Sequence, residues 1–131
     1  MKTLIAEDDF TSRLLLQEIL KNYGSVHIAV NGTEAVEAVL RARMEGEPYD
    51  LVCMDIMMPK MDGQEALRYI REQEEAQGIV STHGAKIVMT TSLNDMKNII
   101  AAHHNLCDAY LFKPIEKAKL LQELRKLELI K

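Results

Sequence analysis

Residues 51–63 read Leu-Val-Cys-Met-Asp-Ile-Met-Met-Pro-Lys-Met-Asp-Gly, and they predict a strand, a loop and the start of a helix. Residues 51–54 form a short apolar run, which is typical of a strand buried on both faces. Asp55 follows directly, so one carboxylate is expected at the carboxyl end of that strand. Asp62 then begins an Asp-x-x-Glu arrangement that is typical of a helix N-terminus. This order of elements is the repeating unit of a parallel α/β sheet.

The same unit recurs on both sides of this stretch. Short apolar runs predict four more strands, at 3–6, 26–29, 87–89 and 109–112. Apolar residues at helical spacing, with N-cap and stop signals, predict helices over 11–22, from Asn31 to Leu40, from Asp62, over 95–104 and around 120–127. Polar residues predict loops at 43–49 and 77–84. Five strand–helix units with right-handed crossovers favour a doubly wound α/β fold with a five-stranded parallel sheet, (βα)5.

The composition limits the classes of protein to consider. The 131 residues include 16 Lys and Arg against 20 Asp and Glu, and the resulting net charge of −4 argues against a general nucleic-acid binder. The chain contains no apolar run long enough for a transmembrane helix or a signal peptide, so we expect a cytoplasmic protein with no membrane partner. Cys53 and Cys107 each lie in an apolar stretch and are expected to be buried thiols. Without linkers or repeats, residues 1–131 predict one domain.

Polar residues cluster at the predicted ends of four strands. Glu7-Asp8-Asp9 follow the first strand, Asp55 the third, Thr90-Thr91-Ser92 the fourth and Lys113 the fifth. Ligands of doubly wound sheets bind at this edge. Carboxylates gathered there favour a hard cation such as Mg²⁺, and a carboxylate beside a metal can act as a nucleophile toward phosphorus. The hydroxyl and ammonium groups opposite are suitable partners for phosphoryl oxygens.

These residues resemble the motif of response-regulator receiver domains of the free-standing, CheY-like kind. Glu7-Asp8, Asp55, Thr91 and Lys113-Pro114 match the motif, and residues 55–63 are similar to the signature D-x-x-M-P-x-M-D-G. The resemblance covers essentially the whole chain. It implies a flavodoxin-like fold with strand order 2-1-3-4-5, and no output domain.

The resemblance also implies the roles of the acidic residues. Asp55 would be the phosphoacceptor. The Mg²⁺ ligands would be Asp8, Asp55 and the backbone carbonyl of Met57, with Glu7 bound through water. The run Glu7-Asp8-Asp9 offers two acidic pairs, Glu7-Asp8 and Asp8-Asp9. We favour the first, because family members place the pair directly after the apolar strand. Asp9 is then expected to be structural, as a helix N-cap.

The remaining site residues come from the last two strands. Thr91 resembles the hydroxyl that turns toward the phosphoryl group, and Lys113 resembles the cation that bridges to it. Family members often have a cis peptide bond before the next proline, here Pro114. Tyr110 resembles the aromatic residue that moves inward on activation. Thr90 is expected to be structural, because its side chain should point to the opposite face from Thr91.

The implied function is a phosphorylation switch of a two-component system. A sensor histidine kinase or phosphotransfer protein would phosphorylate Asp55. The surface of helix four, strand five and helix five would then change and regulate an unidentified protein partner, with a dimer as a further expectation. The protein would catalyse only its own phosphorylation and dephosphorylation.

Two other functions compete with this hypothesis. A small aspartate-dependent phosphohydrolase of the haloacid dehalogenase type also uses Asp, Thr or Ser, Lys and Mg²⁺, but its nucleophile lies on the first strand in an Asp-x-Asp motif. A degenerate receiver would serve only as a scaffold. Nothing in the sequence favours it, because all the chemical positions are filled.

Overall fold

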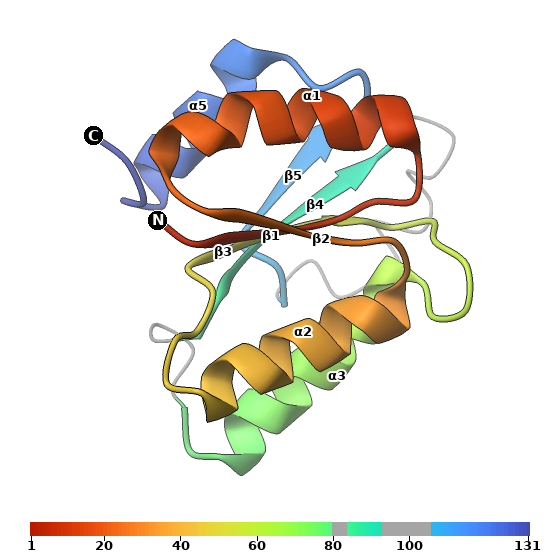
Figure 1. The fold of residues 1–131 in the computed structure, drawn as a ribbon, viewed down its shortest axis with the longest axis vertical. Coiled ribbons are helices and arrows are strands. Elements are labelled where there is room, and N and C mark those ends of the chain that lie inside the picture. The colour runs from red at the N-terminus through yellow and green to blue at the C-terminus, as the bar shows by residue number, and fades with distance from the viewer. Residues whose placement is uncertain (80–83, 93–105) are drawn as a thin grey trace.

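The computed structural model describes residues 1–79, 84–92 and 106–131. The helix predicted over 95–104 and part of the loop predicted over 77–84 lie outside these residues. Within the described residues, five strands form one parallel sheet in the order β2-β1-β3-β4-β5, so the predicted fold is confirmed (Figure 1). The strands are β1 (Thr3–Ala6), β2 (Val26–Ala29), β3 (Leu51–Asp55), β4 (Lys86–Thr91) and β5 (Ala109–Phe112).

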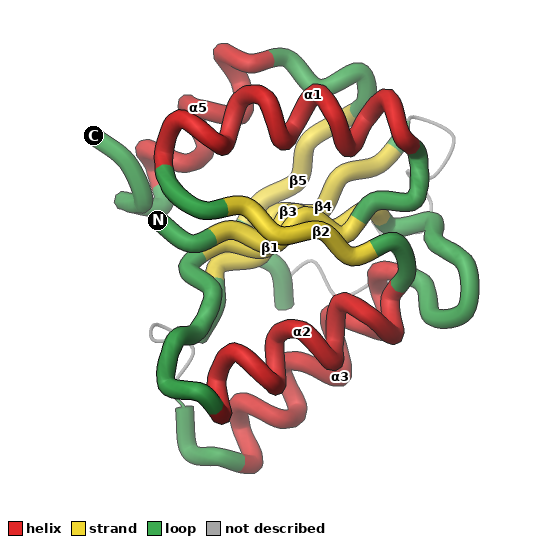
Figure 2. The backbone as a smooth tube through the Cα atoms, viewed as in Figure 1, coloured by secondary structure: helices red, strands yellow, loops and turns green. Residues whose placement is uncertain are grey.

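Helices cover both faces of the sheet, as Figure 2 shows, with α1 and α5 on one side and α2 and α3 on the other. The helical elements are α1 (Phe10–Leu20), the 3₁₀ turn η1 (Lys21–Tyr23), α2 (Gly32–Met44), α3 (Gly63–Ala76) and α5 (Lys117–Lys126). The expectation that Arg43 begins a loop was wrong, because α2 continues through Met44. Arg43 is a good helix former, and its guanidinium pairs with Glu74 of α3, which favours the extra turn.

Side-chain caps begin α1, α2 and α3. The Asp9 carboxylate accepts a hydrogen bond from the Ser12 N–H, so the cap predicted for Asp9 is present. The Asn31 side chain caps α2 in the same way, and the Asp62 carboxylate caps α3. Each cap satisfies a backbone N–H that has no partner within the helix.

The core consists of two layers, because alternate side chains of each strand point to opposite faces. Met54 and Met89 face α2 and α3. Cys53 and Val88 face α1 and α5. Cys53 is buried and Cys107 partly buried, and the two do not form a disulfide.

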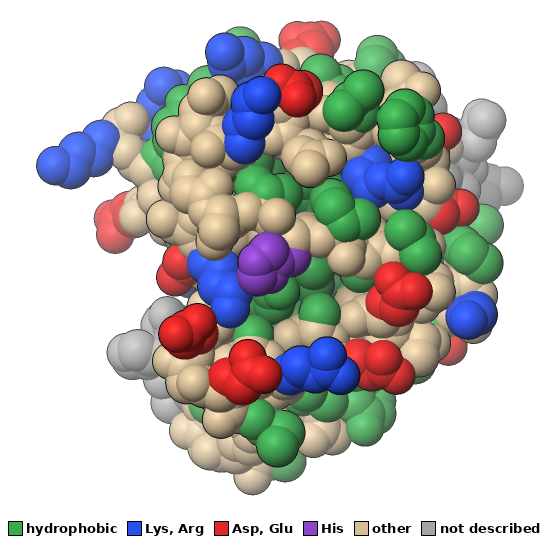
Figure 3. All heavy atoms as spheres, viewed as in Figure 1, with side chains coloured by type: hydrophobic (Ala, Val, Ile, Leu, Met, Phe, Trp, Pro, Cys, Tyr) green, Lys and Arg blue, Asp and Glu red, His purple; other side chains and the backbone are tan. Residues whose placement is uncertain are grey.

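The strand β2 differs from the expectation of a strand buried on both faces, because His27 and Ile28 are exposed. It is an edge strand, so only β1 pairs with it in the described sheet. Exposed apolar side chains lie on α1 and just after β2, among them Phe10, Leu14 and Val30, and Figure 3 shows green side chains gathered in this region. No described helix is long and apolar enough to cross a membrane.

Both chain ends lie where the strands begin. The Lys2 backbone N–H donates to the Asp50 carboxylate, just before β3. Near the other end, Leu129 lines a hollow together with Asp50 and Lys86, which precede β3 and begin β4. The two ends therefore meet the sheet at the edge opposite the carboxyl ends of its strands.

Candidate functional site

Among the residues that the structure describes, three carboxyl groups meet at the carboxyl edge of the sheet. Glu7 and Asp8 follow β1, and Asp55 is the last residue of β3. One carboxylate oxygen from each lies within 4.8 Å of the others. Glu7 and Asp55 are buried, whereas Asp8 is exposed. The structure therefore brings together the favoured acidic pair and the predicted acceptor, and it places Asp9 in the helix cap.

Backbone contacts fix the position of Asp55. Next to it, the Ile56 N–H donates to the Thr90 carbonyl at 3.0 Å, and the Gly63 N–H donates to the Ile56 carbonyl at 2.8 Å. A Cβ atom on Gly63 would lie 2.1 Å from the Asp55 carbonyl oxygen, so only glycine allows α3 to begin this close to the strand. The Met57 N–H donates to the Asp55 carboxylate. Met57 thus lies beside the predicted acceptor, in the loop where the resemblance places it.

Lys113 bridges the two buried carboxylates. Its Nζ lies 3.0 Å from Glu7 Oε1 and 3.2 Å from Asp55 Oδ2. Its backbone N–H donates to the Thr91 carbonyl at 2.7 Å, which holds the end of β5 beside the end of β4. The Lys113–Pro114 peptide bond is cis, as the resemblance implies.

Glu7, Asp55 and Lys113 influence one another's ionisation. Burial raises the pKa of Glu7 to about 7, and the nearby Asp55 carboxylate adds to the rise. Burial also raises the pKa of Asp55, although Lys113 opposes this effect. The two carboxylates in turn raise the pKa of Lys113 and so favour its charged form. The site therefore favours a bound cation or a retained proton.

The residues present fit a divalent cation. Glu7 Oε2 is buried and has no hydrogen-bond partner among the described residues, although a buried carboxylate oxygen is costly to leave unpaired. The metal-binding atoms that the described residues offer there are carboxylate oxygens, which Mg²⁺ prefers, and exposed Asp8 leaves a route for the ion and its waters.

The two threonines at the end of β4 are both buried. The Thr91 hydroxyl donates to the Ser92 carbonyl at 3.2 Å. Thr90 pairs with Asp55 in the sheet register, and its hydroxyl is buried. Thr91 thus lies at the carboxyl end of β4, which is where the predicted switch hydroxyl is expected.

Tyr110 lies on β5 and packs against the α2–α3 layer of the core. Its hydroxyl is buried, and the Cys107 thiol is its neighbour. Sequence reasoning did not anticipate this contact, nor the role of Gly63. For Gly63, the available signal in the sequence was a glycine placed directly after the expected cap residue Asp62.

The chain is similar to known signalling proteins. The pattern of the response regulator receiver domain family matches residues 3–125. The sensor histidine kinase GacS of Pseudomonas protegens is 33% identical over 124 residues, which cover 92% of this chain and 12% of that protein. The sensory/regulatory protein RpfC of Xanthomonas campestris pv. campestris is 35% identical over 124 residues, covering 95% of this chain and 16% of that protein. The chain therefore spans less than a fifth of the length of these curated relatives.

Solved structures share the fold. One is the receiver domain of the histidine kinase PA1611 from Pseudomonas aeruginosa, which has a magnesium ion coordinated in its active site cleft. It is 27% identical, with a TM-score of 0.75 and coverage of 97% of both chains. Another is the receiver domain of Ssk1 from Saccharomyces cerevisiae, in complex with the phosphotransfer protein Ypd1. It is 29% identical, with a TM-score of 0.80 and coverage of 97% of this chain and 88% of that one. Fold, acidic edge and family pattern agree: the chain belongs to the response regulator receiver domain family of two-component signalling.

Proposed function

We propose that Asp55 accepts a phosphoryl group from a phosphohistidine of a sensor kinase or phosphotransfer protein. A carboxylate oxygen of Asp55 attacks the phosphorus atom, and the imidazole leaves with the electron pair of the broken P–N bond. The observation that carries the proposal is the cluster of Glu7, Asp8 and Asp55 within 4.8 Å, with the Lys113 ammonium 3.2 Å from Asp55. The Ssk1–Ypd1 complex supports a phosphotransfer protein as the donor.

The remaining residues of the site would balance the negative charge of the transferred phosphoryl group. Asp8, Asp55 and the Met57 carbonyl would bind Mg²⁺ directly and Glu7 through water, and the bound ion would neutralise phosphoryl oxygens. Lys113 stays charged between the carboxylates and is placed to pair with a phosphoryl oxygen. Pro114 follows this lysine directly. In this proposal the protein catalyses only its own phosphorylation and dephosphorylation, in the cytoplasm.

The output of the switch is a change in surface. The Thr91 hydroxyl would turn from the Ser92 carbonyl to the phosphoryl group, and Tyr110 on the neighbouring strand β5 would change its position. A hollow of about 500 Å³ between β5 and α5 is lined by Tyr110, Lys113 and Gln122, and offers a partner protein a surface next to the switch. The helix four part of this surface lies outside the described residues. A partner protein or a second copy of the chain would bind at the hollow between β5 and α5 after phosphorylation.

The test is intact-mass analysis after incubation with acetyl phosphate and Mg²⁺. Wild type gains one phosphoryl group, and Asp55→Asn gains none. Asp62→Asn is the matched control, because it removes another carboxylate from the same loop while asparagine still caps α3. Equal labelling of wild type and Asp55→Asn overturns the assignment. Steady hydrolysis of a phosphate monoester would favour an enzyme instead.

A further inference from the structure

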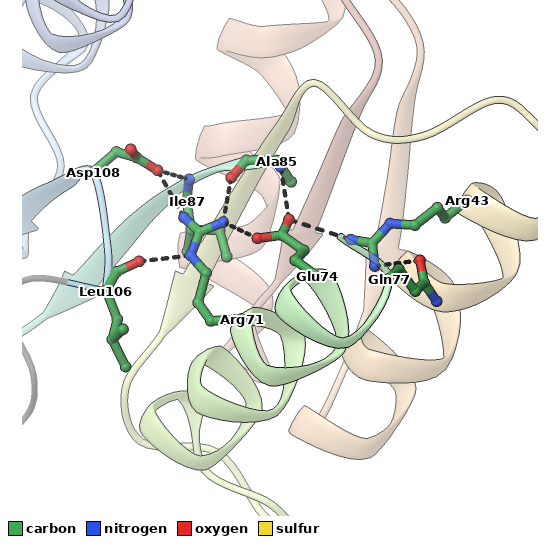
Figure 4. Close-up of polar contacts among 8 residues, drawn as sticks. All are labelled: Arg43, Arg71, Glu74, Gln77, Ala85, Ile87, Leu106 and Asp108. Atoms are coloured by element: carbon green, nitrogen blue, oxygen red, sulfur yellow. Dashed lines mark hydrogen bonds and ion pairs between the residues drawn. The ribbon is translucent and has the colours of Figure 1, made fainter. Parts of the chain in front are cut away.

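Among the described residues, Arg71 of α3 makes four polar contacts near the starts of β4 and β5, at the edge of the sheet opposite the strand ends that carry Asp55 and Thr91 (Figure 4). Its Nε donates to the Leu106 carbonyl at 2.7 Å, and its Nη2 lies 2.9 Å from Asp108 Oδ2. Its Nη1 donates to Glu74 Oε1 and to the Ala85 carbonyl, both at 2.8 Å. One guanidinium therefore joins α3 to the residue before β4 and to the segment before β5.

The other partners of Glu74 do not reach that segment among the described residues. Glu74 is buried and accepts a hydrogen bond from the Ala85 N–H at 3.0 Å. Arg43 of α2 lies 3.2 Å from its Oε2 and also donates to Gln77, so these contacts stay between α2 and the end of α3 (Figure 4). Two arginines share one buried carboxylate, and Arg71 is the one that also holds Leu106 and Asp108.

The segment held by Arg71 contains a residue that lies beside Tyr110. Leu106 and Asp108 are the two neighbours of Cys107, and the Cys107 thiol lies beside the buried Tyr110 hydroxyl. Asp108 is also anchored to β4, because its carboxylate accepts from the Ile87 N–H at 2.8 Å and its N–H donates to the Ile87 carbonyl at 2.8 Å. Arg71 thus fixes the backbone on both sides of the residue that contacts Tyr110.

The guanidinium group is required by this geometry. Its planar fork donates in several fixed directions at once, whereas a lysine ammonium on a flexible stem does not reproduce them. The side chain of Arg71 is only 16% exposed, so water does not readily replace the lost partners.

We infer that Arg71 is a positioning residue for the switch: it fixes Cys107 and thereby stabilises the position of Tyr110 in which its hydroxyl is buried. The inference rests on the proposed function for the meaning of Tyr110, but the contact itself can be tested without phosphorylation. Arg71 acts here through the 106–108 segment, at the end of the sheet away from Asp55.

The first test measures alkylation of Cys107 and Cys53 by iodoacetamide, followed by peptide mapping at one fixed pH. Arg71→Lys and Arg71→Gln each raise the rate at Cys107 by about tenfold, the size expected for loss of a charge-assisted hydrogen bond. The rate at Cys53, which is buried in the central strand β3, does not change. Cys53 therefore separates local opening from unfolding.

Arg43→Lys and Arg43→Gln are the matched controls. They make the same chemical changes at the other arginine that pairs with Glu74, and they leave the Cys107 rate within about twofold of wild type, because the 106–108 segment keeps its contacts with Arg71. Equal rates at Cys107 in wild type and both Arg71 variants overturn the inference. Parallel increases in the Arg43 and Arg71 variants also overturn it, because the effect then belongs to the buried carboxylate in general.

The second test places 3-fluorotyrosine at the four tyrosines and identifies the Tyr110 ¹⁹F signal with Tyr110→Phe. Arg71→Lys moves the Tyr110 signal toward that of solvent-exposed fluorotyrosine, and Arg43→Lys does not. An unmoved signal overturns the inference. Mass analysis of the same samples with acetyl phosphate reports separately on Asp55: absent labelling in wild type defeats the proposed function, while the thiol and ¹⁹F results still decide the role of Arg71.

Discussion

Glu7 is a fully buried carboxyl group with one oxygen held by Lys113 and the other without a hydrogen-bond partner among the residues described. Its pKa is raised from 4.5 to about 7 by burial and by Asp55. In the absence of a metal, the folded protein therefore retains a proton that the unfolded chain releases between pH 4.5 and 7. Because the folded pKa is raised, the contribution of Glu7 to stability is full below pH 4.5 and is lost as the pH rises toward 7.

The variant Glu7→Gln isolates this effect, because glutamine imitates the protonated acid. We expect wild type and variant to have similar melting temperatures at about pH 4.5 in EDTA. At about pH 7.5 the variant melts at the higher temperature, because it has no buried carboxylate to ionise. Differential scanning calorimetry across this range measures the difference. A difference that stays constant with pH would contradict the raised pKa of Glu7.

Lys113 compensates the charge of Glu7 and Asp55 when no cation is bound. Replacing it in Lys113→Met keeps the side-chain stem but leaves two buried carboxylates facing each other. In EDTA at about pH 7.5 we expect a loss of about 2 kcal/mol in the free energy of unfolding. Addition of Mg²⁺ should restore part of this loss, because the ion replaces the missing positive charge.

Urea denaturation with and without Mg²⁺ measures this recovery. Lys117→Met is the control, since Lys117 is an exposed residue at the start of α5. The same loss in both variants, or no recovery with Mg²⁺, would mean that Lys113 does not compensate these carboxylates.

At the scale of elements, the contact between α3 and β3 determines where Asp55 lies. A Cβ atom at Gly63 would meet the Asp55 carbonyl oxygen at 2.1 Å, so α3 and the strand end cannot keep their positions with any larger residue. Gly63→Ala should destabilise the protein by about 2 kcal/mol, in the range for overpacking, and should also slow labelling of Asp55 by acetyl phosphate.

Gly46→Ala provides the comparison for this variant. Gly46 has a φ of 77°, so alanine is strained there. A methyl group at this position would have no atom of the described residues within 4 Å. Gly46 lies between α2 and the start of β3, whereas Asp55 is the last residue of β3. The variant should lose stability without any change in the labelling rate. Labelling that falls equally in both variants would mean that lost stability alone slows the reaction.

Much of this arrangement could be predicted from the sequence, because local patterns determine it. The apolar run 51–54 and the carboxylate that follows it predicted β3 and the place of Asp55, and the Asp-x-x-Glu arrangement predicted the start of α3. The Arg71 contacts could not be predicted in this way. They join α3 to Ala85, Leu106 and Asp108, which lie 14 to 37 residues further along the chain, and no local pattern indicates such a contact.

The end of α2 shows the same limit. Gly46 and Pro48 indicated a loop from Arg43 onward, yet α2 reaches Met44. The deciding contact is between Arg43 and Glu74 of α3, which is a tertiary contact and overrides a local signal. Sequence reasoning also missed that Tyr110 meets Cys107, because it considered the tyrosine and the thiol separately.

At the scale of the whole molecule, Mg²⁺ binding should appear as added stability. An ion present at about a hundred times its dissociation constant, and bound by the folded chain alone, raises the free energy of unfolding by about 2.7 kcal/mol. Thermal melts should therefore shift upward with MgCl₂ in wild type. The shift should be absent in Asp8→Asn, which removes the exposed carboxylate of the cluster.

A KCl series at matched ionic strength controls for general screening. Asp9→Asn is the matched variant, since Asp9 caps α1 and asparagine preserves that cap. If Asp8→Asn and wild type gain equally from MgCl₂, the cluster is not the magnesium site.

The position of the two chain ends has a practical consequence for sensor construction. Lys2 and Leu129 lie near Asp50, at the edge of the sheet opposite Asp55. A fluorescent protein or a surface tether attached at either end would therefore lie on the side of the domain away from Asp55, where the proposed function places the approach of a phosphohistidine. Donor and acceptor fluorophores could occupy both ends without blocking the reaction, so this receiver suits immobilised assays in which many candidate kinases are screened against one exposed face.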